Sequence, residues 1–321
     1  MEHFTDRIAV VTGGGTGMGR ELVRQLSAEG CHVALCDVNE DTMAETVSLA
    51  EKEAPAGTRL TTFVADVSEE AQMSAFRDHV TSHFGTDHVH LVFNNAGIGG
   101  GGSFLVDERE SWERTFGICW GGVYNGCRAF LPLLVASDGG HLVNVSSVNG
   151  FWASIGPYTP HTAYSAAKFA VRGFTEALLT DLRINAPHVQ AHVVMPGHIG
   201  TSIVLNSAAI LGHRPEDMTA DDLQRMRDTA ARLGMDTSTV SDDDLRGFVQ
   251  TRGEMFRDAA PTTAEQAATI ILDGVRAGQW RILVGTDAGV MDRRVRAEPE
   301  DAYEAEFFQD VIREGGMNLG L

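Results

Sequence analysis

Seven short apolar runs alternate along the chain with longer stretches whose apolar residues recur at helical spacing. The apolar runs are residues 7–12, 32–37, 60–65, 90–94, 141–146, 189–195 and 281–284, and the helix-patterned stretches are residues 17–29, 41–53, 69–84, 108–135, 162–185 and 264–277. Strands separated by crossover helices pair in parallel, so this alternation predicts an α/β fold with one doubly wound parallel sheet and helices on both faces. No repeat, linker or composition break divides the 321 residues, and we expect a single domain.

Two regions interrupt the alternation. Residues 201–261 lie between the sixth run and the next helix, and residues 286–321 form a charged C-terminal extension after the last run. Helical patterns occur at residues 221–233 and 242–255 in the first region and at 299–313 in the second. A connection as long as the first is usually a binding element, so we predict a substrate lid there. The predicted dinucleotide-binding and catalytic domain, lid included, spans residues 1–285.

Composition and charge exclude several function classes. The net charge of -19 disfavours binding to nucleic acid or to an anionic membrane surface. No run approaches the ~18 apolar residues of a membrane span, and residues 1–6 lack the basic start of a signal peptide. The cysteines, which are Cys31, Cys36, Cys119 and Cys127, have no zinc-type spacing and are read as free thiols. We therefore expect a cytoplasmic protein.

A glycine-rich turn follows the first apolar run and opens the first helix. Residues 12–19 read Thr-Gly-Gly-Gly-Thr-Gly-Met-Gly. Gly13 permits the tight turn, Gly17 lets the backbone approach a pyrophosphate, and Gly19 lets helix and strand pack closely. The helix N-terminus supplies amide donors for the anion. This context predicts a dinucleotide-binding turn.

Asp37 ends the second run, 20 residues after Gly17. A carboxylate there accepts hydrogen bonds from the adenosine ribose hydroxyls and repels a 2′-phosphate. Thr16 and Val38, which flank the same region, are not basic. The pattern favours NAD over NADP. An alternative role, in which Asp37 caps the next helix, is compatible with this one.

Tyr164 and Lys168 stand at i and i+4 and so share one helix face. A tyrosine with a pKa of ~10 is a poor base at neutral pH, but a neighbouring ammonium would lower that pKa by about 2–3 units. The tyrosine could then exchange a proton with an alcohol or a ketone. Lys168 is one of only two lysines, and Ser147 ends the fifth run, where its hydroxyl could bind the reacting oxygen.

With these motifs in place, the chain resembles the short-chain dehydrogenase/reductase family, in its branch with a TGxxxGxG turn and a YxxxK pair. Further matching pieces are Asp66-Val67, Asn94-Asn95-Ala96-Gly97, Ser147, and Pro196-Gly197 with Thr201, in family order over residues 5–202. The resemblance implies a Rossmann-like seven-stranded sheet of order 3-2-1-4-5-6-7. It also implies a homo-oligomer, either a dimer or a homotetramer.

The resemblance assigns roles by position. Tyr164 is expected to be the catalytic acid/base, Lys168 to bind the nicotinamide ribose and depress the tyrosine pKa, and Ser147 to orient the substrate oxygen. The residues expected to contact the cofactor are Gly13, Thr16, Gly17, Met18, Gly19, Asp37, Asp66, Val67, Asn94, Ala96, Gly97, Tyr164, Lys168, Pro196, Gly197, Ile199 and Thr201. No metal is expected, because the neighbouring His79, His83, His88 and His90 lack carboxylate or cysteine partners at ligand spacing.

The chain departs from the family pattern in two places. Cys119 stands where the family usually has an asparagine that holds a water of the proton relay, and a thiol is a weak donor and acceptor. Asn125 lies on a different helix face and is not expected to replace that asparagine. The spacing of 17 residues from Ser147 to Tyr164 is about four more than is common in the family. We interpret the aromatic insert at residues 151–160 as a wall of the substrate pocket.

The leading hypothesis is an NAD-dependent oxidoreductase that moves hydride between nicotinamide and a bulky or apolar secondary alcohol/ketone. Two alternatives stay open: an NADPH-dependent ketoreductase, and a non-catalytic NAD-binding sensor. Asp37 argues against the first, and the combination of Ser147, Tyr164 and Lys168 argues against the second. His198, beside Pro196 and Gly197, is expected near the nicotinamide.

Overall fold

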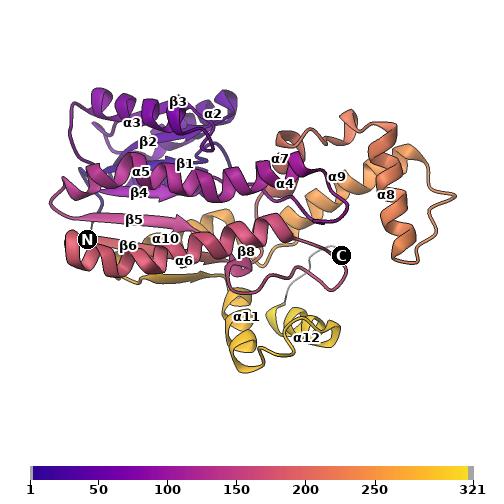
Figure 1. Cartoon of the computed structure of the whole chain (residues 1–321). Coiled ribbons are helices and arrows are strands. Elements are labelled where there is room, and N and C mark those ends of the chain that lie inside the picture. Colours follow the sequence, from indigo (N-terminus) through magenta and orange to yellow (C-terminus); the bar gives the residue numbers. More distant parts are fainter. Residues whose placement is uncertain (1–2, 317–321) are drawn as a thin grey trace.

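The computed structural model describes residues 3–316 and contains one seven-stranded parallel sheet with helices on both faces (Figure 1). The strands are β1 (Ile8–Thr12), β2 (His32–Asp37), β3 (Leu60–Val64), β4 (Leu91–Asn94), β5 (Gly140–Val145), β6 (Val189–Pro196) and β9 (Arg281–Val284). Their spatial order is β3-β2-β1-β4-β5-β6-β9, and every neighbouring pair is parallel. The predicted fold class and strand order are confirmed.

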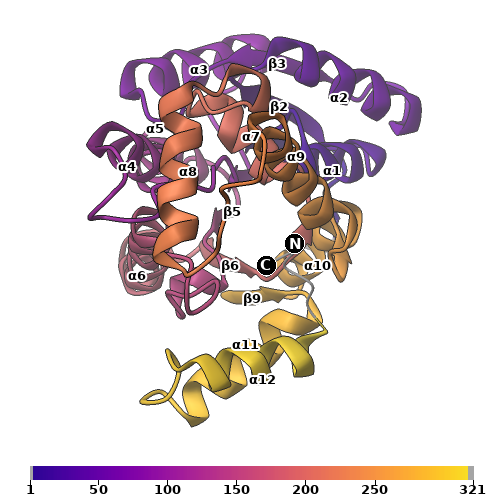
Figure 2. The ribbon, with the colours of Figure 1, turned by 90° about the vertical axis from the view of Figure 1, so that its right-hand side faces the viewer.

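Three helices cover each face of the sheet (Figure 2). One face carries α1 (Gly17–Ala28), α2 (Glu40–Glu53) and α10 (Ala264–Arg276), and the other carries α3 (Glu70–Phe84), α5 (Gly122–Val135) and α6 (Thr162–Asn185). Successive strand residues point to opposite faces, so Val10 packs toward α3 and α5 while Val11 packs toward α1. Because both faces are covered, the strands are apolar throughout, as the sequence predicts.

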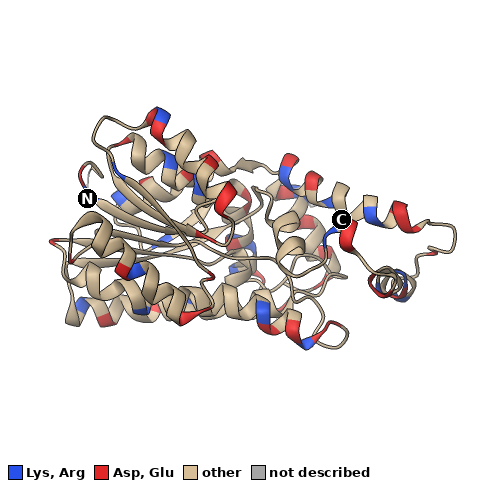
Figure 3. Cartoon of the chain, turned by 90° about the horizontal axis from the view of Figure 1, so that it is seen from above, with Lys and Arg blue, Asp and Glu red and all other residues tan. Residues whose placement is uncertain are grey.

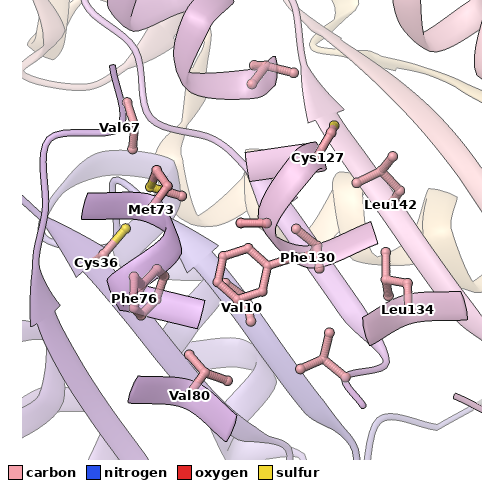
Figure 4. Close-up of a cluster of buried hydrophobic side chains, with 14 of the residues drawn as sticks. Val10, Cys36, Val67, Met73, Phe76, Val80, Cys127, Phe130, Leu134 and Leu142 are labelled. Carbon is pink, nitrogen blue, oxygen red and sulfur yellow. The ribbon is translucent and has the colours of Figure 1, made fainter. Parts of the chain in front are cut away.

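The core beneath α3 and α5 shows how this packing is achieved (Figure 4). Phe76 of α3 meets Phe130 of α5 edge to face, with ring centroids 5.4 Å apart, and both side chains are fully buried. Val10 and Leu142 form the floor from the sheet. Burial of each large apolar side chain stabilises the fold by about 1.5–3 kcal/mol, so this face holds the sheet rigid.

The helix predicted at residues 108–135 is interrupted, which corrects that prediction. It consists of α4 (Arg109–Phe116), a π-helical turn (Gly117–Gly121) and α5. A π turn widens the helix by one residue, and glycines at both of its ends offer little resistance to that widening. The wider turn contains Cys119 and Trp120, and it turns Cys119 inward to full burial.

The lid region lies beyond the carboxyl ends of the strands, at the right of Figure 1. It contains α7 (Ile203–Ile210), a 3-10 turn (Pro215–Asp217), α8 (Ala220–Arg232) and α9 (Asp242–Asp258). The helices predicted at 221–233 and 242–255 are present, whereas α7 has no side-chain cap and was not predicted. Thr219 and Ser241 begin α8 and α9 with complete capping boxes. Charged residues are frequent along the lid helices, while the strands are nearly free of them (Figure 3).

The base of the lid is a second, two-stranded sheet. β7 (Ile199–Gly200) precedes the lid and β8 (Thr262–Thr263) follows it, and the two strands pair in parallel. Met218, Leu223 and Leu245 form a separate buried cluster inside the lid.

The C-terminal extension is a pair of helices, α11 (Thr286–Ala297) and α12 (Ala305–Gly315), packed beside β9 (Figure 2). The single helix predicted at 299–313 is therefore wrong in its start, because residues 298–304 form the connection between the two helices. The ends of the predicted ranges, residues 1–2 and 317–321, lie outside the described residues. None of the described helices is long and apolar enough to cross a membrane.

Candidate active site

The glycine turn after β1 has the geometry that a phosphate requires. Gly13 and Gly17 have φ of 66° and 55°, a left-handed conformation that other residues rarely adopt. A side chain at Gly19 would collide with the carbonyl oxygen of Gly13. Thr12 Oγ1 accepts hydrogen bonds from the backbone N–H groups of Asn95 at 3.0 Å and Ala96 at 3.1 Å. The turn is thus joined to the chain that follows β4.

A cavity of about 330 Å³ opens above this turn. The predicted cofactor residues that line it are Gly13, Thr16, Gly17, Met18, Asp37, Asp66, Val67, Ala96, Gly97 and Thr201. It runs from Asp37 across the turn to Thr201, whose Cγ2 would lie 3.1 Å from a Cβ at Gly17. An extended dinucleotide fits this cavity. Backbone amides and small residues line the middle of the cavity, where the pyrophosphate would lie, and a carboxylate lines one end.

Sequence reasoning missed part of this lining. The further residues are Val38, Asn39, Thr42, Ala65, Asn95, Ile98, Arg114, Ile118, Ile203, Asn206, Ala209, Ile210 and Arg214. Five of them come from the lid region, including Asn206, whose Nδ2 donates to Thr16 Oγ1 at 3.1 Å. No motif marks these five, since only the fold of the lid brings them to the cavity.

Five other predicted cofactor residues do not line the cavity. Asn94 Nδ2 donates to Asn144 Oδ1 at 2.8 Å, a buried link between β4 and β5. Gly19 packs on the turn itself. Pro196 ends β6, Gly197 follows it, and Ile199 is buried in β7. Contact of these residues with the cofactor stays a prediction.

The half-buried carboxylate of Asp37 faces the cavity. Oδ2 accepts the N–H of Gly15 at 3.0 Å, and Oδ1 accepts the N–H of Asn39 at 3.2 Å. The cap of α2 is Asn39, whose side chain accepts the N–H of Thr42, so the alternative capping role for Asp37 is not its role. Within residues 3–316, Asp37 forms no ion pair, which leaves its negative charge at this end of the cavity.

Asp66 is held by Arg114. Arg114 donates to Oδ2 at 2.5 Å, and Ser68 donates to Oδ1 through its N–H and its hydroxyl. Burial alone would raise the pKa of Asp66, but these hydrogen bonds outweigh burial and hold that pKa below its usual value. The resulting pair lines the cavity at the end of β3, beside Asp37.

Tyr164, Lys168 and Ser147 come together where α6 passes the end of β5. Lys168 Nζ lies 5.4 Å from the centroid of the Tyr164 ring and donates to the carbonyl of Val145 at 2.9 Å. Ser147 is buried and lies near enough to the Tyr164 hydroxyl to lower its pKa. Gly97, which lines the cavity, has Lys168 Nζ 3.4 Å from the position of its missing Cβ. The predicted triad is therefore adjacent to the cavity.

In the cofactor-free protein, burial raises the pKa of Tyr164 above its ordinary value, the nearby Cys119 adds to the rise, and Ser147 opposes it only in part. Burial also lowers the pKa of Lys168, because the ammonium loses its hydration. The expected lowering of the Tyr164 pKa is therefore absent in this state, and it stays a prediction for the protein with its cofactor bound.

Cys119 occupies the position expected for it. Its Sγ donates to the carbonyl of Ile98 at 3.1 Å and lies 3.7 Å from the position of the missing Cβ of Gly97. Burial raises the pKa of this thiol, while Lys168 opposes the rise. Asn125 donates instead to the carbonyls of Val67 and Ser68, as expected for a residue on another face.

The aromatic insert packs mainly away from the reacting groups. Trp152 is buried among Phe307 and Phe308 of α12, and its Nε1 donates to the carbonyl of Ala302 at 2.7 Å. Tyr158 is exposed. The interpretation of residues 151–160 as a pocket wall is thus wrong for Trp152, which anchors the C-terminal helices. No sequence pattern indicates this contact, because α12 lies far from Trp152 along the chain.

His198 and His161 flank the triad. His198 follows β6, and its Nε2 contacts the carbonyl of Phe256 in α9 at 2.6 Å. The His161 ring packs against Tyr164 with centroids 4.6 Å apart, and its buried Nε2 has no hydrogen-bond partner in the described part of the chain.

The separate histidine group near α3 makes local contacts. His79 Nε2 hydrogen-bonds to Thr61 Oγ1 at 2.7 Å, and His90 Nδ1 accepts the N–H of Ile8 at 3.1 Å. Within the described part of the chain, no cluster of three or more metal-ligating side chains occurs.

Comparisons with known proteins agree with this geometry. The family model described as short chain dehydrogenase matches residues 7–209. The putative oxidoreductase SadH of Mycobacterium tuberculosis is 37% identical over 293 residues, which is 91% of this chain and 91% of SadH. A Burkholderia phymatum short chain dehydrogenase/reductase in complex with NAD has a TM-score of 0.74 at 27% identity, covering 94% of this chain and 96% of its own. A metagenomic short-chain oxidoreductase in complex with NADP has a TM-score of 0.53 at 27% identity, covering 60% and 83%.

Proposed function

Because this chain belongs to the short-chain dehydrogenase/reductase family and is an NAD(P)-dependent oxidoreductase, we propose that it interconverts a secondary alcohol and a ketone with NAD as the preferred cofactor. The observation that carries the proposal is the adjacency of Tyr164, Lys168 and Ser147 to the dinucleotide-shaped cavity. The overall reaction converts one ketone, one NADH and one proton into one secondary alcohol and one NAD⁺.

Side chains of this protein transfer the proton and orient the substrate oxygen. When bound, the nicotinamide supplies or accepts the hydride at the substrate carbon. Tyr164 donates its proton to the ketone oxygen, or takes one from the alcohol, and Ser147 hydrogen-bonds the same oxygen. Lys168, fixed by Val145, stabilises the phenolate that remains after proton donation. Since burial raises the pKa of Tyr164, the phenol is protonated before the cofactor binds, which suits the reducing direction.

The preference for NAD rests on Asp37. Its carboxylate lines the cavity without an ion-pair partner among the described residues, and Val38 and Asn39 beside it are uncharged. A 2′-phosphate there would meet like charge. The NAD-bound structure of a relative at 27% identity supports this preference, whereas the NADP-bound one keeps NADPH as the alternative cofactor.

One apolar contact of the lid supports a bulky or partly apolar substrate. Leu211, just after α7, packs on the same apolar cluster as Tyr164, and this cluster includes Ile98 and Ile118. The lid therefore adds an aliphatic side chain to the cluster on which Tyr164 packs. A ketone with a sizeable hydrocarbon portion would bury that surface on binding.

Exposed apolar residues on two helices support a homo-oligomer. Tyr124 of α5 and Phe169 and Ile184 of α6 are 44%, 42% and 73% exposed. A second copy would cover these side chains. Light scattering at several protein concentrations tests this, and a monomer at all of them would contradict it. We keep the cytoplasm as the proposed location.

The test of the function combines binding and turnover. NADH and NADPH are titrated side by side by fluorescence, and a panel of ketones and secondary alcohols is then followed at 340 nm. We expect tighter NADH binding and turnover of at least one panel member. In Tyr164→Phe, turnover should fall by about 10²–10⁴-fold while NADH binding is retained. NADH binding with no turnover across the panel would favour the non-catalytic sensor instead, and tighter NADPH binding would favour the ketoreductase alternative.

A further inference from the structure

Arg252 lies on the face of α9 that points into the molecule. It is three residues after Val249, which packs on the lid cluster, and four before Phe256, whose ring packs on His198 with centroids 4.3 Å apart. Residues at these spacings share one side of a helix. The guanidinium therefore projects from the lid between the lid cluster and the loop that follows β6.

The positive charge of Arg252 reaches the reacting groups. Burial and the nearby Arg252 together lower the pKa of His161 to about 4. His161 packs against the Tyr164 ring, with centroids 4.6 Å apart. Arg252 of α9 therefore lies near His161, which packs on Tyr164, while Lys168 contacts the same tyrosine from α6.

Arg252 differs from the other arginines of α8 and α9 that face a carboxylate. Arg225, Arg227, Arg246 and Arg257 pair with Asp222, Asp242, Asp243 and Asp258 respectively. Within residues 3–316, Arg252 has neither an ion pair nor a side-chain hydrogen bond, although it is half-buried and burial lowers its pKa. A partly buried cation that meets no protein carboxylate loses part of its hydration without compensation. The missing partner is accounted for if an anion arrives with the ligand.

We propose that Arg252 binds an anionic group of the substrate, so that the substrate is a ketone or secondary alcohol that also carries a carboxylate or phosphate. This inference rests on the proposed function, since it concerns the same site. The planar guanidinium binds a carboxylate or phosphate through two parallel hydrogen bonds. His161, whose buried Nε2 lacks a partner, offers a further hydrogen bond between the anion and the reacting oxygen at Tyr164.

The remaining surroundings fit an anion carried by an apolar chain. Val249 and Phe256 flank Arg252 on α9, and Leu211 packs on the same apolar cluster as Tyr164. An aliphatic segment joining the carbonyl to the anionic group would contact these side chains. Elsewhere the chain is strongly acidic, with a net charge of -19, so Arg252 provides local attraction that the whole protein does not.

The experiment compares matched substrates on matched variants. A medium-chain keto acid, its methyl ester and the corresponding keto phosphate are assayed with NADH on the full-length wild type, Arg252→Gln, Arg252→Lys and Arg257→Gln. Arg257 is the control, because it lies on the same helix, is exposed and pairs with Asp258.

We expect the wild type to prefer an anionic substrate over the ester. Arg252→Gln should raise KM for the anionic substrate by about 10- to 100-fold, as for loss of a charge-assisted hydrogen bond, and change the ester by less than about threefold. Arg252→Lys should fall between these values, and Arg257→Gln should match the wild type. The anionic substrate whose KM changes more in Arg252→Gln, the keto acid or the keto phosphate, identifies the anion that Arg252 binds. Equal effects of Arg252→Gln on acid and ester, or a wild-type preference for the ester, would overturn the proposal.

A binding measurement separates this proposal from the proposed function. Thermal stabilisation of the NADH complex by each ligand is measured on the same variants. If no panel member turns over but the anionic ligand stabilises the wild type and not Arg252→Gln, the anion site stands and the oxidoreductase proposal fails. If the ester is reduced and the anionic ligands neither react nor bind, the oxidoreductase proposal stands and the anion site fails.

Discussion

Asp287 Oδ2 accepts a hydrogen bond from the backbone N–H of His198 at 2.6 Å. The contact joins the first turn of α11 to the loop after β6, which the sequence analysis assigns to the nicotinamide. Asp287 is fully buried, and its second oxygen, Oδ1, has no hydrogen-bond partner among residues 3–316. The C-terminal helices therefore help to fix a loop of the candidate active site.

The buried carboxyl of Asp287 gives a prediction about how the stability of the fold depends on pH. Burial raises the pKa of its carboxyl above the ordinary value. A carboxyl of this kind contributes stability below its unfolded-state pKa of ~4, and that contribution is lost as pH rises through the folded-state pKa. Asp287→Asn keeps an acceptor for the His198 N–H and removes the ionisation.

We therefore expect Asp287→Asn to gain stability relative to wild type between pH 4 and pH 7. Urea denaturation of both proteins at the two pH values measures this difference, and other titrating groups cancel in the comparison. A difference that is the same at both pH values would contradict the prediction. Asp287→Ala, which also removes the acceptor, should be less stable than Asp287→Asn by about 1–3 kcal/mol.

Asp37 gives a prediction about cofactor choice. Asp37→Asn retains acceptor capacity for the Gly15 N–H and removes the negative charge that faces the cavity. We expect the ratio of NADH to NADPH affinity to fall by about 10- to 100-fold, mainly through tighter NADPH binding. Fluorescence titration with both cofactors measures the ratio. An unchanged ratio would show that Asp37 does not exclude the 2′-phosphate.

The thiols should be inert in the folded protein. Cys31, Cys36, Cys119 and Cys127 are buried and free, and burial raises the pKa of each, to about 12 for Cys127. Since the thiolate is the reactive form, we expect iodoacetamide at pH 8 to label the native protein at least about 100-fold more slowly than the protein in 6 M guanidinium. Mass spectrometry counts the labels. Fast native labelling of Cys119 would instead identify a reactive thiol beside Lys168.

Trp152 should couple the C-terminal helices to global stability. Trp152→Ala removes a fully buried ring from the cluster with Phe307 and Phe308, and we expect a loss of about 3–5 kcal/mol. Trp152→Phe keeps most of the packing and loses the hydrogen bond to Ala302, so about 1 kcal/mol is expected. Denaturant unfolding followed by circular dichroism gives both values. Phe104→Ala, at an exposed loop, is the control, and a Trp152→Ala loss no larger than that of the control would refute the coupling.

The sequence contained most of the information needed for the sheet and for the reacting groups. Apolar runs and the glycine turn identified the strands, because burial on both faces of a parallel sheet demands continuous apolar residues. The resemblance then supplied the strand order. Tyr164 and Lys168 were found from their spacing, and the structure brings both beside Ser147.

Features that depend on distant packing could not be read from local patterns. The π turn at Cys119 leaves the helical spacing of apolar residues nearly unchanged. The sequence therefore predicts one helix where the structure has α4 and α5. Trp152 is predicted to line a pocket from its place in the aromatic insert. Its actual partners in α12 are more than 150 residues away in the sequence, so no local pattern indicates them. Arg252 belongs to no sequence motif. Its position depends on the packing of α9 against His198, which only the structure shows.

The two-residue pairing of β7 with β8 makes the lid a modular insertion. Ile199 pairs with Thr262 and Gly200 with Thr263, so the chain leaves the main sheet and returns to it at nearly the same point. About sixty residues between them carry their own capping boxes and their own small core. Such a segment can be lengthened, shortened or exchanged between relatives while β6 and α10 keep their positions. New substrate preferences can therefore evolve in α8 and α9 while α7, which lines the nucleotide cavity, and the glycine turn stay the same.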